Sequence, residues 1–546
     1  MESGNNFEYL EGQGRQRKYD KSKGSTDHIF ILRNIMALAK KEGRHLFISF
    51  FAVQKAYDKA DMNDMLYVLH KNGFKGKLWH LTQSLNQDLT AKVKTKAGLT
   101  REIKRERGGK QGGKLMVPMF AKTMDTLAED MMENENLGIR LREDHIPALL
   151  FMDDVMTFAE GYDQQQQTLE AVTEFGLKHR IEWGENKCKV LECGTHKESK
   201  TEWPLGEKTI QTCQDYKYLG EVITRDGKNE DNLISRFHKV KAAVRAINTC
   251  GKNNIMKRIE IKLLITLHNA VTLPTVLYIA ETWPLNASIR KEINKMEIWA
   301  WKSMLGLPKT TPNAAIIFCT GALYASIRIE TKQLLYLHKI LQKPEYHWTI
   351  QSLYAIKDHN IGWARQILDI LETWGLEEDW NSIKQKTYNT WKSEVHKAAE
   401  KKNRDKIRED CLTKTRGEEK IKTKTKTIIP QLDASEFQRK PEYFMDENNK
   451  LIARAYIMGR YGMLQCASNF STGYGGKICS QCDMIDDENH RINFCKVWKG
   501  TNLADCNDKV VFEDLYSGDI LVSMPIAKKI VDLWDLGNGR NCMRIE

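Results

Sequence analysis

The sequence lacks the features that would place a protein in a membrane or outside the cell. No run among its 546 residues approaches the roughly 20 uninterrupted apolar residues that a membrane span needs. The N-terminus, Met1-Glu2-Ser3-Gly4-Asn5-Asn6, has no apolar signal region, which argues against secretion. Without such a signal, most of the twelve cysteines are expected to be reduced core thiols. The ordinary apolar fraction, 41%, and the length predict a soluble chain of several structural units with no membrane partner.

The charge of the chain is shifted to one sign. Lys and Arg number 84 against 72 Asp and Glu, which gives a formal net charge of +12. Such a surplus favours a polyanionic partner, because cationic side chains release counterions from phosphate backbones. Solubility alone explains the surplus equally well. One run of alternating lysines has no core-facing stripe and fits either a phosphate-tracking strip or a solvated linker: Lys420, Lys422, Lys424 and Lys426.

The pattern of apolar residues changes along the chain. Short apolar runs alternate with amphipathic stretches over residues 25–225, which predicts mixed strands and helices. From 230 to 345 the pattern is mostly helical, and from 346 to 430 the helices become highly charged. A compact Cys- and Gly-containing unit follows. The resulting boundaries are 1–226, 227–345, 346–430 and 431–546.

Two adjacent carboxylates, Asp153-Asp154, separate two apolar halves between Ala148 and Phe158. This pattern predicts a hairpin with acidic residues at its turn. Adjacent carboxylates can hold divalent ions, and phosphoryl transfer gains most from two such ions roughly 3.5–4 Å apart. By itself, however, an Asp-Asp between apolar runs is more often a plain β-turn.

Further motifs surround this pair in a fixed order. They are Ser25-Thr26-Asp27-His28, Phe51-Ala52-Val53-Gln54-Lys55-Ala56-Tyr57-Asp58, Gln111-Gly112-Gly113 with Phe120, Phe151-Met152-Asp153-Asp154, Asn186-Lys187-Cys188-Lys189 and Tyr218-Leu219-Gly220. Their order and spacing resemble the reverse transcriptase motifs of non-LTR (LINE-type) retrotransposons over roughly residues 11–310. The resemblance implies an α+β right-hand polymerase: fingers and palm with an antiparallel sheet over 1–226, and a helical thumb over 227–345. A helical basic connector follows over 346–430, and a small zinc-binding unit over 431–546.

The resemblance also assigns roles, position by position. Asp153 and Asp154 match the catalytic pair that binds Mg²⁺ in the palm. Tyr57 matches the aromatic gate that excludes a ribose 2′-OH; without the family it would be a core aromatic. Gln111 and Gly112 match the loop that contacts the template and the nucleotide. Lys187 matches the lysine that assists pyrophosphate release; without the family it would be a surface lysine. Leu219 and Gly220 match the turn of the primer grip.

Two positions depart from the family pattern. The family has Asp-Val-x-Lys-Ala-(Phe/Tyr)-Asp, and its first Asp is a ligand to both metals, but this chain has Ala52 there. Asp58 matches the second Asp, which is not the ligand, and is expected beyond the end of the strand. Met116 stands where the family favours Ser. Losing a group that stabilises transition-state charge costs about 3–4 kcal/mol, so we expect impaired catalysis from Ala52.

Four residues near the C-terminus have the spacing of a zinc site. Cys479 and Cys482 are followed by His490 and then Cys495. Two close cysteines, a histidine and a further cysteine supply the four ligands of a tetrahedral Zn²⁺, which predicts a structural ion. The alternative is a set of unligated reduced thiols. The unit also resembles the CCHC element after the thumb of many non-LTR reverse transcriptases.

These observations leave two hypotheses open. The first is an RNA-directed DNA polymerase with impaired catalysis, which uses template RNA, primer DNA, dNTPs and Mg²⁺. The second is an inactive nucleic-acid-binding protein that retains the fold. No endonuclease motif is found in the sequence, so we expect a truncated copy of a mobile element. Its partners would include a full-length protein of that element, in a cytoplasmic or nuclear ribonucleoprotein.

Overall fold

The computed structural model describes residues 24–86, 89–104, 107–109, 115–194, 200–249 and 261–413. This part of the chain forms two compact units. The first holds residues up to 231 together with 282–284 and 337–369, and the second holds 232–281, 285–336 and the residues from 370 onward. Several sequence predictions lie outside the described residues: Gln111, Gly112, Lys420, Lys422, Lys424, Lys426, Cys479, Cys482, His490 and Cys495.

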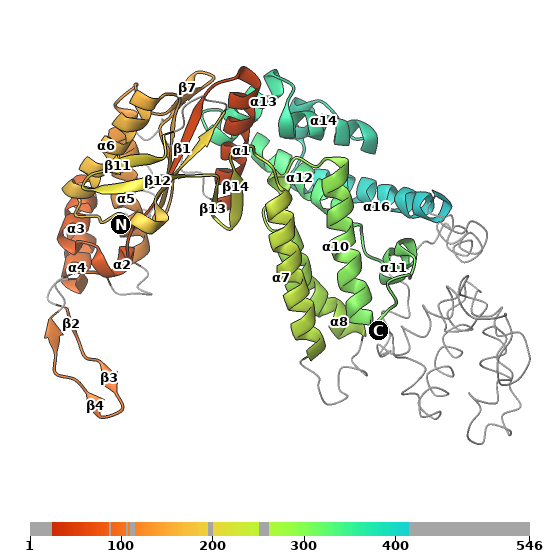
Figure 1. The fold of residues 1–546 in the computed structure, drawn as a ribbon, viewed down its shortest axis with the longest axis horizontal. Coiled ribbons are helices and arrows are strands. Elements are labelled where there is room, and N and C mark those ends of the chain that lie inside the picture. The colour runs from red at the N-terminus through yellow and green to blue at the C-terminus, as the bar shows by residue number, and fades with distance from the viewer. Residues whose placement is uncertain are drawn as a thin grey trace, which may run out of the picture. The chain divides into compact units, whose positions relative to one another are not determined.

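A six-stranded sheet forms the centre of the first unit (Figure 1), in the order β11-β12-β10-β1-β9-β8. Its strands are β1 (Leu46–Ala52), β8 (Ala148–Phe151), β9 (Asp154–Ala159), β10 (Lys189–Cys193), β11 (Glu202–Leu205) and β12 (Lys208–Cys213). All named pairs are antiparallel except β10 with β12. Every residue of β1 is buried, which explains why its sequence is a continuous apolar run.

Two long helices cover one face of this sheet. They are α5 (Met116–Met132), which packs on β8, and α6 (Tyr162–Lys178), which packs on β9 and β11. Phe47 and Phe51 lie on the same face of β1, because alternate residues of a strand share a face. Both contribute to the hydrophobic cluster between the sheet and these helices. Between them, the buried hydroxyl of Ser49 accepts a hydrogen bond from the Gln165 amide nitrogen at 2.7 Å.

The opposite face of the sheet packs on a second hairpin and on helix α1 (Ser25–Glu42). The hairpin consists of β13 (Asp215–Tyr218) and β14 (Glu221–Thr224). The ring of Phe50 stacks on Tyr216 with centroids 4.1 Å apart. Helix α13 (Trp348–Asp358) packs along α1, although about 310 residues of chain lie between them. The sequence offered no signal for this contact, and the predicted domain boundaries remain predictions.

The remaining elements of the first unit are short. They are α2 (Ala56–Lys59), α3 (Met62–Lys71), α4 (Gly76–Asn86), β2 (Thr90–Ala91), β3 (Lys94–Thr95), β4 (Gly98–Leu99), β5 (Ile103–Lys104), β6 (Ile139–Leu141), β7 (Asp144–Ile146) and η1 (Glu185–Lys187). Strands β2 to β5 form a narrow hairpin that projects from the helices in Figure 1 and is exposed along its length.

The second unit is helical in its described part, as the apolar pattern predicted. Its helices are α7 (Glu230–Thr249), α8 (Ile261–Leu267), η3 (His268–Thr272), α9 (Leu273–Leu277), η4 (Ala280–Thr282), α10 (Ala287–Leu305), α11 (Asn313–Thr320), α12 (Ala325–Leu341), α15 (Trp380–Gln385) and α16 (Tyr388–Thr413). Helix α12, whose residues from Leu337 onward belong to the first unit, is divided between the two units, as is α14 (Gly362–Trp374).

One stretch of the described chain, Leu263–Thr282, has the length and hydropathy of a membrane span. The stretch is interrupted by the π-helical turn η3 and by Pro274, and it contains the fully buried polar residues His268 and Thr272. Buried polar groups in an interrupted helix are typical of helices that pack inside a protein.

Candidate active site

The two adjacent carboxylates lie where β8 turns into β9. Phe151 pairs with Asp154, so Met152 and Asp153 form a two-residue turn. Met152 has φ 57°, the left-handed conformation that tight hairpin turns require, although it is unfavourable for a bulky residue. The predicted hairpin with acidic residues at its turn is confirmed.

Ala52 lies directly beside this turn. In the antiparallel pair of β1 and β9, Ala52 is the partner of Asp154, and the Val53 amide donates to the Asp153 carbonyl at 3.2 Å. Side chains of directly opposed residues share one face of a sheet, with Cβ atoms about 4.5–5.5 Å apart. The predicted neighbourhood of Ala52 and the acidic turn is therefore confirmed, and the methyl group stands where a third carboxylate would meet the other two.

The negative charge of this turn is only partly offset by the described residues. Burial raises the pKa of Asp154, and the adjacent Asp153 charge raises it further, while Lys187 acts in the opposite direction. The same Asp154 charge adds to burial in raising the pKa of Tyr216 and of Tyr218. A half-buried carboxylate held beside a second one favours the arrival of a cation.

Lys187 is placed near the acids by the end of β1. The Gly184 amide donates to the Ala52 carbonyl at 3.0 Å, and η1 follows immediately. The Lys187 carbonyl accepts a hydrogen bond from the Tyr216 hydroxyl at 2.8 Å, which connects this turn to β13. Lys187 is thus brought to the acidic turn, as the motif order implied, while its part in pyrophosphate release stays a prediction.

Tyr57 begins the helical turn after β1. It lies half-buried in α2 with its ring 5.8 Å from that of Phe120. Its carbonyl accepts a hydrogen bond from the Gly109 amide at 2.8 Å. A Cβ at Gly108 would stand 2.4 Å from the Asp58 carbonyl oxygen, so only glycine fits there. The segment that leads to Gln111 therefore runs directly against α2.

Asp58 does not replace the missing carboxylate. It is exposed on α2, beyond the end of β1 at Ala52, as predicted. Within the described residues, no group of three or more His, Cys, Asp or Glu side chains is arranged to hold a metal ion. The donors at the acidic turn are therefore Asp153 and Asp154. They fit one cation that draws its remaining ligands from phosphates and water, and they leave a two-ion site incomplete.

Met116, the second departure from the family pattern, is part of the hydrophobic core. It begins α5 and is 5% exposed. Its sulfur occupies the space beside Gly109, where a Cβ would come within 1.8 Å of it. The larger side chain is thus accommodated by packing against a glycine, and the residue offers no polar group to the site.

The predicted primer grip, Leu219-Gly220, forms the tip of the β13–β14 hairpin. Both residues have positive φ, 45° and 88°, as a two-residue turn of this kind requires. At the base of the turn, Glu221 is fully buried and accepts hydrogen bonds from Arg33 at 3.2 Å and from the Trp283 indole at 2.9 Å. No pattern in the sequence indicated this contact among three distant residues.

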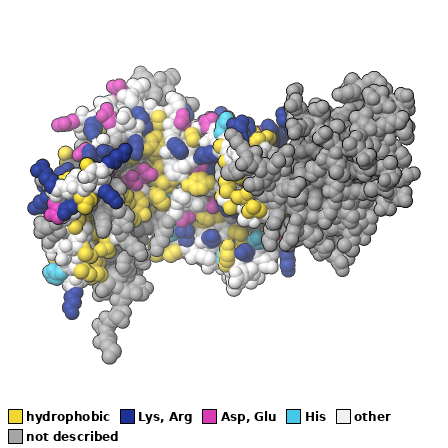
Figure 2. Space-filling model, turned by 90° about the horizontal axis from the view of Figure 1, so that it is seen from below, with side chains coloured by type: hydrophobic (Ala, Val, Ile, Leu, Met, Phe, Trp, Pro, Cys, Tyr) yellow, Lys and Arg dark blue, Asp and Glu magenta, His cyan; other side chains and the backbone are white. Residues whose placement is uncertain are grey.

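A second feature that sequence reasoning missed is the basic hairpin β2–β5. Lys92, Lys94 and Lys96 alternate along one edge of it, and all three are exposed. The alternation Lys-Val-Lys-Thr-Lys was the signal that could have found it. Figure 2 shows that Lys and Arg side chains also gather beside hydrophobic ones elsewhere on the surface.

An antiparallel sheet with an acidic hairpin at its end and helices on one face defines the palm of a right-hand polymerase. Residues 12–223 match the family model described as reverse transcriptase (RNA-dependent DNA polymerase). This part of the chain is therefore similar to reverse transcriptases, and two relatives that it matches are proteins of retrotransposons.

Two of these relatives are Pol polyproteins of the type-1 retrotransposable element R2. The one from Nasonia vitripennis is 25% identical over 242 residues, which cover 42% of this chain and 23% of that protein. The one from Popillia japonica is 24% identical over 161 residues, which cover 29% of this chain and 23% of that protein. The matches thus span about a quarter of the length of these relatives.

Among solved structures, the chain is similar to telomerase. The Candida albicans telomerase has a TM-score of 0.34 and 12% identity, over 69% of this chain and 55% of that one. An apo telomerase from Candida tropicalis has a TM-score of 0.34 and 13% identity, over 71% of this chain and 60% of that one.

Proposed function

We propose that this chain is an RNA-directed DNA polymerase of a non-LTR retrotransposon whose catalysis is impaired. Its substrates would be template RNA, primer DNA and dNTPs. The observation that carries the proposal is the pairing of Ala52 with Asp154. The Asp153-Asp154 turn beside β1 supports the proposal, and a methyl group stands where the resemblance has the first metal ligand.

Magnesium would be held by Asp153 and Asp154. When bound, Mg²⁺ supplies charge stabilisation to the transferred phosphoryl group. The two carboxylates would hold the ion that arrives with the nucleotide phosphates, because such an ion brings most of its own ligands. Tyr57 would lie against the sugar of the nucleotide, and Lys187 would offset the negative charge at the acidic turn. Nucleotide binding should therefore survive while polymerisation is nearly lost.

A second function follows from the same observation. A chain that binds nucleic acid and cannot align two metal ions would act as a binding protein with the polymerase fold. Two observations favour this binding protein. Ala52 carries a methyl group where the resemblance has a carboxylate, and Asp58 is exposed outside the metal site. The intact Asp153-Asp154 turn and the core position of β1 favour the polymerase.

Primer extension on a poly(rA) template separates the two functions. Ala52→Asp should raise extension by at least about a hundredfold, the effect of recovering about 3 kcal/mol of transition-state stabilisation. Ala52→Asn is the matched control, because it has the size of Asp without its charge, and it should restore far less. If Asp58→Asn abolishes extension by the unaltered chain, Asp58 supplies the missing ligand. No recovery in Ala52→Asp would favour the binding protein.

Two parts of the proposal concern residues outside the described structure. Structural Zn²⁺ would be held by Cys479, Cys482, His490 and Cys495, whose spacing supports a closed tetrahedral site. The alternating lysines from Lys420 to Lys426 would bind phosphates of the RNA, together with the exposed lysines of the β2–β5 hairpin. A full-length protein of the element would complete the ribonucleoprotein, in the cytoplasm or the nucleus.

A further inference from the structure

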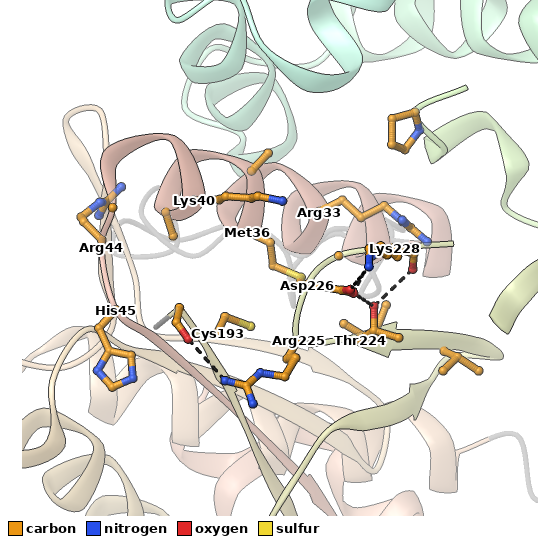
Figure 3. A pocket seen from close by; sticks show the side chains of 18 residues that line it. Arg33, Met36, Lys40, Arg44, His45, Cys193, Thr224, Arg225, Asp226 and Lys228 are labelled. Atoms are coloured by element: carbon orange, nitrogen blue, oxygen red, sulfur yellow. Dashed lines mark hydrogen bonds and ion pairs between the residues drawn. The ribbon is translucent and has the colours of Figure 1, made fainter. Parts of the chain in front are cut away.

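A cavity of about 730 Å³ lies between the C-terminal half of α1 and strand β14 (Figure 3). We name it the α1–β14 cavity. His45, the residue before β1, lines it, whereas Ala52 ends that strand. Seven residues of strand at about 3.3 Å each put the cavity roughly 20 Å from the acidic turn. It is therefore separate from the polymerase site.

The cavity is built by backbone turns and small residues. Gly43, Gly194 and Gly227 line it, and all three have positive φ. A Cβ at Gly43 would meet no atom within 4 Å, and one at Gly227 would meet only the Met36 methyl, at 4.0 Å. In Figure 3, Met36 points from α1 into this space. Its volume is in the range of ligand sites, about 300–1,000 Å³.

The charges at its rim are largely paired. Three of the five Lys and Arg side chains that line it face carboxylates: Arg33 faces Glu221, Arg44 faces Glu42 and Glu160, and Lys228 faces Asp226. Within the described contacts, the other two face no carboxylate. Lys40 is exposed on α1, and Arg225 donates to the Gln214 side chain at 3.2 Å and to the Gly194 carbonyl at 3.4 Å. Two positive charges thus remain, one on each wall.

The walls between these charges are apolar. Met36, Ile223 and Pro284 line the cavity, from α1, from β14 and from the segment that follows Trp283. The ligand that such a site accepts has an aliphatic body and a negative charge at each end. Lys40 and Arg225 are both exposed, so a carboxylate can reach either of them from solvent.

We propose that the α1–β14 cavity binds an acidic peptide segment of a partner protein. Its Leu or Met side chain enters between Met36 and Ile223, and its flanking Asp or Glu carboxylates pair with Lys40 and Arg225. The charge complementarity of these two cations selects an acidic segment over a basic one. The occupant is a peptide, because an acidic peptide carries aliphatic side chains and carboxylates on one chain and so matches both the apolar walls and the two cations.

One observation argues against RNA in this cavity. Single-stranded RNA uses aromatic faces on which its bases stack. The one aromatic ring among the lining residues, His45, already packs on Phe47 with centroids 4.3 Å apart and pairs with Glu192.

The test uses the full chain and a fluorescein-labelled peptide of alternating Leu and Glu, read by fluorescence polarisation. We expect saturable binding that Lys40→Glu and Arg225→Glu each weaken by at least about tenfold, because each reverses a charge that faces the ligand. Lys41→Glu is the matched control, because Lys41 is the neighbouring exposed lysine and does not line the cavity. Its affinity should stay within about twofold of the unaltered chain.

Three results would overturn the proposal. The first is no saturable binding up to about 1 mM peptide, the weak end of specific association. The second is an equal loss in Lys41→Glu, which would mean that only the general charge matters. The third is displacement of the peptide by labelled oligo(rU) whose own binding also depends on Lys40, which would assign the cavity to RNA. Because Lys40 is exposed, its replacement leaves the core unchanged.

Discussion

The β8–β9 and β13–β14 hairpins of the first unit each have an acidic residue directly after the turn, but the surroundings of the two carboxylates differ. In each, a two-residue turn that contains a residue with positive φ is followed by an acid that pairs with an aromatic residue: Asp154 with Phe151, and Glu221 with Tyr218. Glu221 is fully buried, and Arg33 and the Trp283 indole satisfy it. Asp154 is half-buried and faces a second carboxylate and a methyl group.

The difference separates a structural charge from a functional one. A carboxylate that the protein neutralises itself fixes a hairpin, because it joins residues from three distant segments. Two adjacent carboxylates repel each other, and a bound metal ion reduces this electrostatic repulsion. Alanine in place of a carboxylate at position 52 lowers this repulsion, and Ala52 is buried at the end of β1. The fold would therefore persist in a chain whose catalysis is impaired, as we propose.

The first prediction tests the β8–β9 hairpin by removing one of its two carboxylates. In the Ala52→Asp background, Asp153→Asn should return primer extension to the level of the unaltered chain, a loss of at least about a hundredfold. The carboxamide cannot bind Mg²⁺ as the carboxylate does, while it keeps the size of the side chain. Single-turnover primer extension measures the effect. An Ala52→Asp chain that stays active without Asp153 would mean that the metals are held elsewhere.

The second prediction tests the β13–β14 hairpin by removing its buried carboxylate. Glu221→Ala should destabilise the protein by about 3–5 kcal/mol, because it leaves the Arg33 charge and the Trp283 indole without their acceptor. Urea unfolding followed by tryptophan fluorescence measures the loss. Glu202→Ala, on the exposed face of β11, is the control and should change stability by less than about 0.5 kcal/mol. A similarly small effect of Glu221→Ala would show that the buried acid is not held by these contacts.

The same distinction applies to the proposed zinc unit, whose thiolates a metal would neutralise. Purified protein should carry about one Zn²⁺ per chain, with its ligands about 2.0–2.3 Å from the ion. Cys482→Ser should release the metal and unfold the C-terminal unit. Cys506→Ser is the matched control, because Cys506 lies outside the ligand spacing, and it should retain zinc. Elemental analysis decides, and zinc-free fresh protein would contradict the assignment.

The alternating lysines are proposed to bind phosphates of the RNA. Replacing Lys420, Lys422, Lys424 and Lys426 by Gln should lower the slope of log affinity for single-stranded RNA against log salt. Each lost phosphate contact removes about 0.7 from that slope. The corresponding four Lys→Arg changes preserve the charge and should keep the slope. Filter binding at several salt concentrations measures it, and an unchanged slope in the Gln variant would make this run a solvated linker.

The sequence predicted the arrangement of the site where a local pattern carried it. The apolar run of β1 and the Asp153-Asp154 pair between apolar halves each specify an element from neighbouring residues. The contact of Glu221 with Arg33 and Trp283 could not be predicted, because it joins residues 62 and 188 positions away and no periodicity records such a distance. For the same reason, the packing of Met116 against Gly109 explains a departure from the family only once the space is known.

The last and smallest effect concerns stability rather than activity. Burial and the Asp153 charge raise the pKa of Asp154 in the folded protein, so its charged form opposes folding. Stability is therefore lost as pH rises through this raised pKa and is recovered as pH falls through it toward the unfolded value. Asp154→Asn mimics the protonated form, and at pH 7 it should unfold at a slightly higher temperature than the unaltered chain.

The difference in unfolding temperature between Asp154→Asn and the unaltered chain should shrink as pH is lowered, because the unaltered chain then becomes neutral at Asp154 as well. Adding millimolar Mg²⁺ at pH 7 should also reduce it, since the ion stabilises the chain that keeps both carboxylates. Asp215→Asn, on the exposed start of β13, is the control and should show neither trend. Differential scanning fluorimetry across pH measures all three proteins. If Asp154→Asn is less stable than the unaltered chain at pH 7, the Asp154 charge is neutralised inside the fold, as that of Glu221 is, and the contrast between the two hairpins fails.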